Sequence, residues 1–118
     1  MITSGNVTVL VSDLARSVGF YTETLGLELK VRYGENYAEV AVEGLTVALH
    51  PPVKDGASHG GSQSLSVGFA VPDLRAAVEE LKEKGVSFSR IAEDGFVKLA
   101  FFSDPDGNPL YLAETKRW

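Results

Sequence analysis

The feature that most constrains the fold of this chain is an internal repeat. The stretch VTVLVSDLARSV at 7–18 resembles VGFAVPDLRAAV at 67–78. Further along, YAEVAV at 37–42 matches FVKLAF at 96–101, and GLTVALH at 44–50 matches GNPLYLA at 107–113. Three matches in the same order indicate that one supersecondary unit occurs twice.

Each copy has the same predicted order of elements. A strand with β-branched residues at alternate positions comes first, and an aspartate, Asp13 or Asp73, then caps a helix that ends at Gly26 or Gly85. Three further strands follow in each copy. The predicted strands are 6–11, 28–33, 37–43 and 45–50, then 66–71, 87–92, 96–103 and 109–114. The fold class is therefore α+β, built from two βαβββ modules.

The two modules are expected to form a single domain over residues 1–118, a length that fits one domain with a substantial core. The first module covers 1–51 and the second covers 65–118. Residues 52–64, PVKDGASHGGSQS, are rich in Gly and Ser and are predicted to be the linker between the modules.

Composition excludes several kinds of function. The formal net charge of −5 argues against a nucleic-acid partner, and the absence of cysteine excludes disulfides, thiolate nucleophiles and cysteine metal sites. No apolar stretch approaches the roughly 20 residues that a membrane span needs, and the N-terminus lacks the pattern of a signal peptide. We therefore expect a cytoplasmic protein with no membrane partner.

Alternation along the strands divides their residues between two faces. Apolar positions such as Val9, Val47 and Leu112 are expected to pack on the helices, and Leu99 and Phe101 are assigned to the same side. The opposite face is small and mixed in character. It could lie in water, as one face of an antiparallel sheet often does, or it could line a pocket. This second face is predicted to carry Asn6, Thr8, Tyr37, Glu39, Ala48, His50, Ser66, Phe96, Lys98, Ala100 and Tyr111.

The closing stretch FFSDPDGNPLYLAE at 101–114 is predicted to be a hairpin. Pro105 presets the first corner, the aspartates can accept hydrogen bonds from nearby backbone, and Gly107 can adopt a positive φ. Tyr111 then stands on the mixed face, between Leu110 and Leu112 on the core face.

The segment VSDLARSVGFYTETLGLEL, together with FFSDPDGNPLYLAE, resembles the vicinal oxygen chelate superfamily. That superfamily includes glyoxalase I, extradiol dioxygenases, methylmalonyl-CoA epimerase, fosfomycin-resistance enzymes and bleomycin-resistance proteins. The resemblance implies paired βαβββ modules whose mixed sheet curls to form a cavity, in a homodimer.

In the metalloenzymes of that superfamily, His, Gln and Glu side chains at four positions hold a divalent ion. The resemblance places these positions at Asn6, Ala48, Ser66 and Tyr111, with His50 on the same face as Ala48. Alanine offers no donor, and serine and tyrosine are poor ligands for such ions. The resemblance therefore implies the metal-free branch, which binds compounds as bleomycin-resistance proteins do, with no cofactor and no bound metal.

The resulting prediction is a small-molecule-binding protein that could confer antibiotic resistance by sequestering an aromatic or apolar compound. The predicted ligand-binding residues are Asn6, Thr8, Tyr37, Glu39, Ala48, His50, Ser66, Phe96, Phe102 and Tyr111. One alternative is a glyoxalase-like or dioxygenase-like enzyme, with an unconventional metal site or with His50 or Tyr111 as acid or base. A second alternative is a module whose sheet face binds a protein partner.

Overall fold

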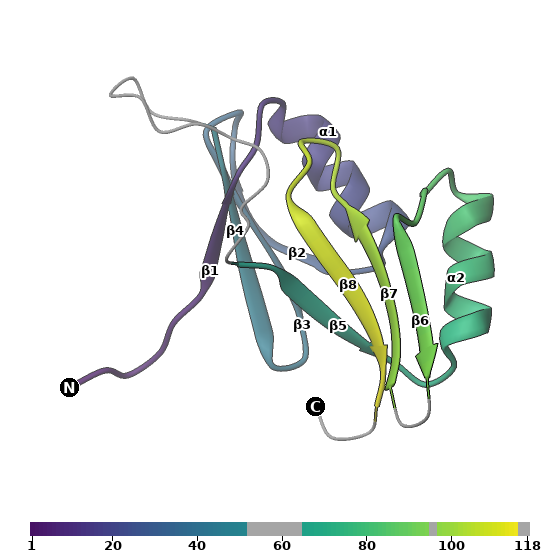
Figure 1. The fold of residues 1–118 in the computed structure, drawn as a ribbon. Coiled ribbons are helices and arrows are strands. Elements are labelled where there is room, and N and C mark those ends of the chain that lie inside the picture. Colours follow the sequence, from purple (N-terminus) through teal and green to yellow (C-terminus); the bar gives the residue numbers. More distant parts are fainter. Residues whose placement is uncertain (52–64, 95–96, 116–118) are drawn as a thin grey trace. The chain divides into compact units, whose positions relative to one another are not determined.

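The computed structural model describes residues 1–51, 65–94 and 97–115. The chain divides into two compact units, Met1–Gly60 and Gly61–Trp118, each with one four-stranded sheet (Figure 1). The predicted linker 52–64 lies outside the described residues. One domain formed by both modules stays a prediction.

The first unit contains β1 (Val7–Leu10), α1 (Leu14–Gly19), the π-helical turn η1 (Phe20–Thr24), β2 (Glu28–Tyr33), β3 (Tyr37–Val42) and β4 (Leu45–His50). Its strand order is β1-β4-β3-β2, and β1 runs parallel to β4 while the other pairs are antiparallel. The sheet is mixed and open, with β1 and β2 as its edges.

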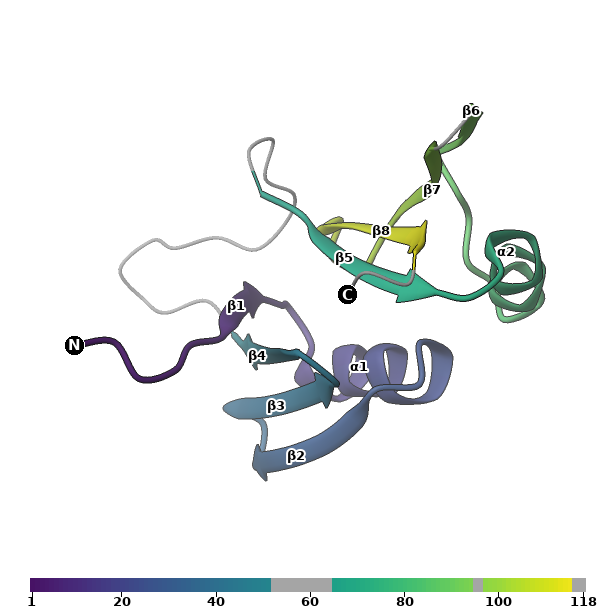
Figure 2. The same cartoon turned by 90° about the horizontal axis from the view of Figure 1, so that it is seen from below.

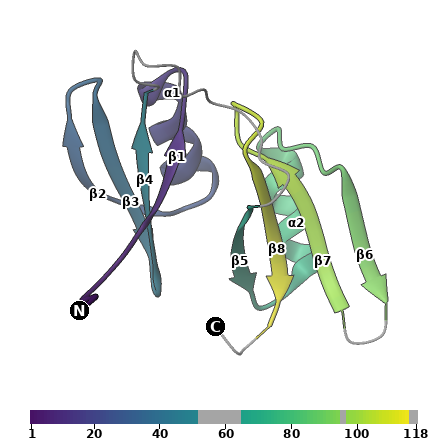
Figure 3. The ribbon, with the colours of Figure 1, turned by 60° about the vertical axis from the view of Figure 1, so that its left-hand side comes forward.

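The second unit contains β5 (Val67–Val71), α2 (Leu74–Glu83), β6 (Arg90–Asp94), β7 (Val97–Ser103) and β8 (Pro109–Glu114). The order β5-β8-β7-β6, with β5 parallel to β8, repeats the topology of the first unit (Figure 3). The prediction of two βαβββ modules in an α+β fold is confirmed. None of the described helices is long and apolar enough to cross a membrane.

The predicted helix caps are present. The carboxylate of Asp13 accepts a hydrogen bond from the backbone N–H of Arg16 (3.1 Å), and Asp73 accepts one from Ala76 (3.1 Å). Gly26 and Gly85 follow the helices with φ values of 86° and 93°. The two helices differ in length, because α1 passes into the π-helical turn after six residues whereas α2 continues for ten.

Each helix packs on one face of its own sheet, and that face forms the core of the unit (Figure 2). We call the other side of each sheet the open face. In the first unit α1 and η1 bury Leu14, Val18 and Tyr21 against strand residues that include Val40 and Leu49. In the second unit, the buried set is Leu74, Val78, Leu81, Ala100, Phe102, Leu110 and Leu112. The predicted core face lies on the helix side in β1, β3, β4, β5 and β8, although Val7 and Val42 at strand ends are exposed.

In β7 the predicted assignment of faces is wrong. Phe101 pairs with Tyr111 on the open face, while Phe102 pairs with Leu110 on the helix side and is 3% exposed. Ala100 also lies on the helix side, opposite Leu112, and so does Lys98. Alternation could not decide the matter, because both faces of this strand carry apolar residues. A register error of an odd number of residues exchanges the two faces.

Candidate functional site

Four side-chain positions form one line across the open face of the second sheet. Gly68 on β5 pairs with Tyr111 on β8, Tyr111 pairs with Phe101 on β7, and Phe101 pairs with Arg90 on β6. We call these four residues the aromatic row. Directly opposed residues in neighbouring strands bring their side chains into contact, so the row is a continuous surface.

The ring of Tyr111 occupies the space above Gly68. A Cβ atom at position 68 would overlap the Cζ, hydroxyl and Cε2 atoms of that ring. The next ring, that of Phe101, lies 6.0 Å from the Tyr111 ring between centroids, with a tilt of 40°. Glycine is thus required at position 68 for the tyrosine to lie flat over β5, and the two rings form the apolar centre of the row.

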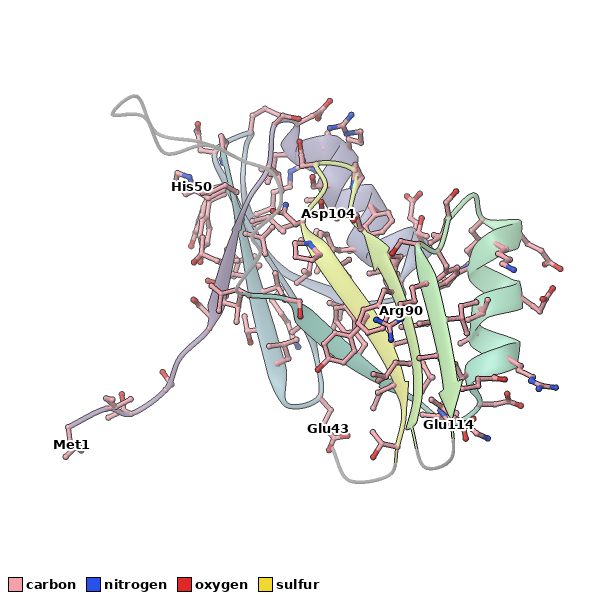
Figure 4. The ribbon with its side chains drawn as sticks, viewed as in Figure 1. Met1, Glu43, His50, Arg90, Asp104 and Glu114 are labelled. Carbon is pink, nitrogen blue, oxygen red and sulfur yellow. The ribbon has the colours of Figure 1, made fainter. Side chains whose placement is uncertain are left out.

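The guanidinium of Arg90 completes the row. Its Cζ atom lies 5.7 Å from the centroid of the Phe101 ring, within the range of a cation–π contact. Figure 4 shows the Arg90 side chain reaching from β6 across β7. Among the described residues, Arg90 has no carboxylate partner, whereas Arg75 on the helix side pairs with Glu93 at 3.2 Å. The row therefore ends in an exposed cation that is not neutralised by a described acid.

The open face of the first sheet is chemically different. It carries the rings of Tyr33, Tyr37 and His50, which come from the neighbouring strands β2, β3 and β4. The rings of Tyr33 and Tyr37 stack at 6.1 Å, and that of His50 meets Tyr37 edge-on at 6.2 Å. We call these three residues with Glu39 the polar cluster.

Two hydrogen bonds hold the polar cluster together. The Tyr37 hydroxyl donates to the carboxylate of Glu39 at 2.6 Å, and this bond, with some burial and the nearby negative charge, raises the pKa of Tyr37. Nδ1 of His50 is hydrogen-bonded to the carbonyl oxygen of Pro51, which holds the ring in position. At neutral pH, Tyr37 is a hydrogen-bond donor and not a phenolate.

The four positions that the resemblance assigns to metal ligands offer a poor set of donors for a divalent ion. Asn6 and Ser66 are exposed residues immediately before β1 and β5, Ala48 has no donor atom, and the Tyr111 ring lies over Gly68. Hydroxyl and methyl groups are poor substitutes for the carboxylates and imidazoles that such ions prefer, so Asn6 is the one residue of the four with a side chain of a suitable ligand type. Within residues 1–51, 65–94 and 97–115, no group of three His, Asp or Glu side chains could hold a metal either.

The structure brings together only part of the predicted ligand-binding set. Thr8, Tyr37, Glu39, Ala48 and His50 share the open face of the first sheet, and Tyr111 lies on that of the second. Phe96 lies outside the described residues. Phe102 is buried on the helix side, where its ring lies 5.4 Å from that of Phe88, so it cannot contact a ligand on the open face.

Sequence reasoning missed Phe101 and Arg90. The sequence feature that could have identified them is the length of the last hairpin. Asp104 accepts backbone hydrogen bonds from Asp106 and Asn108, both at 2.9 Å, which fixes a turn longer than that between β3 and β4. Counting back from this turn places Phe101 opposite Tyr111, and Arg90 follows from the next pairing.

A groove of about 390 Å³ lies on the helix side of the second unit, between α2 and β6. Leu74, Val78 and Ile91 form its apolar floor, and the ion pair between Arg75 and Glu93 lies at its margin. The groove is separated from the aromatic row by the sheet itself.

Three comparisons with known proteins agree with this architecture. A lactoylglutathione lyase from Salmonella typhimurium is 31% identical over 119 residues, covering 90% of this chain and 87% of that protein. A superfamily member from Sphaerobacter thermophilus has a TM-score of 0.79 at 28% identity, with 98% of each chain covered. An antibiotic binding protein from Streptomyces sp. CB03234 has a TM-score of 0.73 at 28% identity, covering 98% of this chain and 99% of that one.

The family assignment rests on the whole described fold and on the sequence. The match to the family spans residues 3–112, which includes both βαβββ modules and the closing hairpin. The chain belongs to the glyoxalase/bleomycin resistance protein/dioxygenase superfamily.

Proposed function

We propose that this protein binds a planar aromatic small molecule without a metal ion, and that it acts by sequestering that molecule. The observation that carries the proposal is the aromatic row. Flat rings on a sheet face offer a large apolar contact area at small entropic cost, and they favour flat ligands. The donor-poor residues at Asn6, Ala48 and Ser66 leave binding as the function that this chemistry supports best.

The similarity to an antibiotic binding protein supports the same proposal. A compound that stacks on Tyr111 and Phe101 would be removed from solution without a change in its covalent structure. The known proteins that resemble this chain include both a binding protein and lyases, so the family alone does not decide between the two activities.

The test is a melting-temperature screen with bleomycin and a panel of planar aromatic antibiotics. A compound at 100 times its dissociation constant stabilises the folded state by about 2.7 kcal/mol, which is readily seen. The affinity of a hit is then measured for Tyr111→Ala and for Phe101→Ala. Each variant is expected to bind about tenfold more weakly, since an aromatic contact is worth roughly 0.5–1.5 kcal/mol beyond its buried area.

Tyr33→Ala is the matched control, because Tyr33 is an exposed aromatic residue on the first unit, 66% accessible. It is expected to leave the affinity unchanged. A panel without a single shift in melting temperature, or equal losses in all three variants, would contradict the proposal.

A lyase or related acid–base enzyme is the second candidate function, and two observations favour it. The lactoylglutathione lyase is similar to almost the whole chain. The polar cluster also joins an imidazole, a phenol and a carboxylate within hydrogen-bonding or ring contact. A lactoylglutathione lyase assay, with and without added Ni²⁺, Zn²⁺ or Mg²⁺, tests it. Turnover that His50→Ala abolishes would favour this candidate.

A homodimer in the cytoplasm remains part of the proposal. Size-exclusion chromatography with light scattering measures the number of chains, and a monomer at micromolar concentration would contradict it.

A further inference from the structure

The open face of the second sheet has an asymmetric distribution of charge. Its described side chains are small or apolar, apart from Arg90 at the β6 end of the aromatic row. Lys98, the nearest other cation in β7, faces the helix side and pairs with Glu114 at 3.1 Å. Among the described side chains, one guanidinium without a described carboxylate partner therefore lies at the end of an apolar aromatic surface.

The guanidinium of Arg90 is suited to bind an acidic group. Its N–H donors lie in a rigid planar fork that can bind an oxyanion at two points. Carboxylates, sulfonates and phosphates accept such donors in pairs, and these charge-assisted bonds are the strongest that an exposed side chain can offer. The cation–π contact with Phe101 holds the side chain in place before any ligand arrives.

The register also sets the size of the ligand. β6 and β8 are two strand spacings apart, so Arg90 and Tyr111 stand about 10 Å from each other. A molecule of two or three fused or linked rings would cover Phe101 and Tyr111 while a substituent at its edge reached Arg90.

We propose that the ligand class of this protein is an anionic planar aromatic compound, whose rings stack on Tyr111 and Phe101 and whose acidic group binds Arg90. This inference rests on the proposed binding function and names the chemistry that the site selects. The chain carries a formal net charge of −5, so its overall field disfavours anions. A preference for an anion would consequently arise from a local cation.

Two fluorescent probes with one skeleton test the inference. 1-Anilinonaphthalene-8-sulfonate is anionic, and N-phenyl-1-naphthylamine is the same framework without the sulfonate. We expect the native protein to bind the anionic probe about tenfold more tightly than the neutral one, with a stoichiometry of one per chain. Raising the NaCl concentration should weaken binding of the anionic probe alone.

Arg90→Gln should remove the preference: the affinity for the anionic probe should fall about tenfold, while the affinity for the neutral probe should stay the same. Arg90→Lys keeps the charge but loses the planar fork of N–H donors, so part of the preference should remain. Arg75→Gln is the matched control, since Arg75 lies on the helix side of the same unit, paired with Glu93, and should change neither affinity. Circular dichroism and melting curves verify that each variant is folded.

The outcomes distinguish a failure of the anionic ligand class from a failure of the binding function. Equal affinity for the two probes in the native protein, or equal losses of both in Arg90→Gln, would overturn the anionic ligand class while leaving aromatic binding intact. Failure of both probes to bind the folded native protein would contradict the binding function itself, and the inference with it.

Discussion

The two units share one topology and differ in what their open faces offer. The strand orders β1-β4-β3-β2 and β5-β8-β7-β6 are the same arrangement, with the same parallel pair at one edge. At the positions where the second sheet carries Tyr111 and Phe101, the first carries Ala48 and Glu39. The repeat has thus preserved the core-facing residues, which the fold requires, while the open-face residues have diverged.

The comparison shows where specificity can reside in a duplicated fold. Core positions are constrained by packing against a helix, and they stay apolar in both copies. An open face has no such constraint, so one copy can present an aromatic surface with a cation while the other presents aromatic rings joined to a carboxylate and an imidazole. We therefore propose that ligand stacking belongs to the second unit and not to the two units equally.

The largest expected loss of stability comes from substitutions in the core, which the two units share. Leu49 and Leu112 occupy corresponding core positions, 0% and 4% exposed. Leu49→Ala and Leu112→Ala should each lower the free energy of unfolding by about 2–5 kcal/mol, through lost burial and the cavity left behind. Urea denaturation measures both. A loss below about 1 kcal/mol in either variant would show that this copy of the core is not packed as described.

The turn between β7 and β8 is longer than the corresponding turn between β3 and β4, and Asp104 holds it together. The carboxylate of Asp104, 4% exposed, accepts from two backbone N–H groups and from the side-chain amide of Asn108 at 2.8 Å. Asp104→Ala should cost about 2–3 kcal/mol, because it leaves these donors without their acceptor. Urea denaturation of Asp104→Ala is compared with that of Glu43→Ala, a substitution in the short turn of the first unit that is expected to cost less. Equal stability of the two variants would contradict the structural role of the Asp104 carboxylate.

Substitutions at two glycines distinguish an effect on the binding surface from an effect on stability. Gly68→Ala places a methyl group where the Tyr111 ring lies, and the ring can move away. The free energy of unfolding should therefore change by less than about 1 kcal/mol, while the affinity for an aromatic probe falls. Gly19→Ala, in the first unit with open space around it, should stabilise α1 by up to about 1 kcal/mol and leave affinity unchanged. Undiminished affinity in Gly68→Ala would rule out the flat Tyr111 ring as the binding surface.

A smaller effect is expected from Glu114, whose carboxylate accepts from the backbone N–H of Leu74 at 2.9 Å and pairs with Lys98. These contacts lower the pKa of Glu114 in the folded state, the first being the larger cause. Its contribution to stability is present above the unfolded-state pKa of a glutamate, about 4.3, and is lost as the pH falls through the lower folded-state pKa. Glu114→Gln should therefore melt at a lower temperature than the native protein at pH 7, and the gap should close in acid. A gap that persists at pH 2 would assign the effect to something other than charge.

The smallest effect, none at all, is expected from metals. Since the donor groups at Asn6, Ala48, Ser66 and Tyr111 do not suit a divalent ion, EDTA and added Mn²⁺, Ni²⁺, Zn²⁺ or Mg²⁺ should leave the melting temperature unchanged. Elemental analysis of protein purified without a histidine tag provides the second readout. One equivalent of a bound metal per chain would contradict the binding assignment.

The sequence predicts most of the fold and less of the site, for a physical reason. Caps at Asp13 and Asp73 and the turn at Asp104 have local chemistry that a single sequence displays, and alternation identifies the core face where only one face is apolar. β7 has Leu99 and Phe101 on one side with Ala100 and Phe102 on the other, so its register depends on the turn beyond it. Because the aromatic row runs through β7, an error of an odd number of residues replaced Phe101 by Phe102 in the predicted set.

The most direct test of the account is chemical-shift mapping of the ¹⁵N-labelled protein during titration with 1-anilinonaphthalene-8-sulfonate. We expect the largest saturable shifts at the backbone amides of Gly68, Phe101 and Tyr111, and small shifts around Tyr37 and His50. Shifts concentrated at Tyr37 and His50, with those of the aromatic row unchanged, would contradict the assignment of ligand stacking to the second unit.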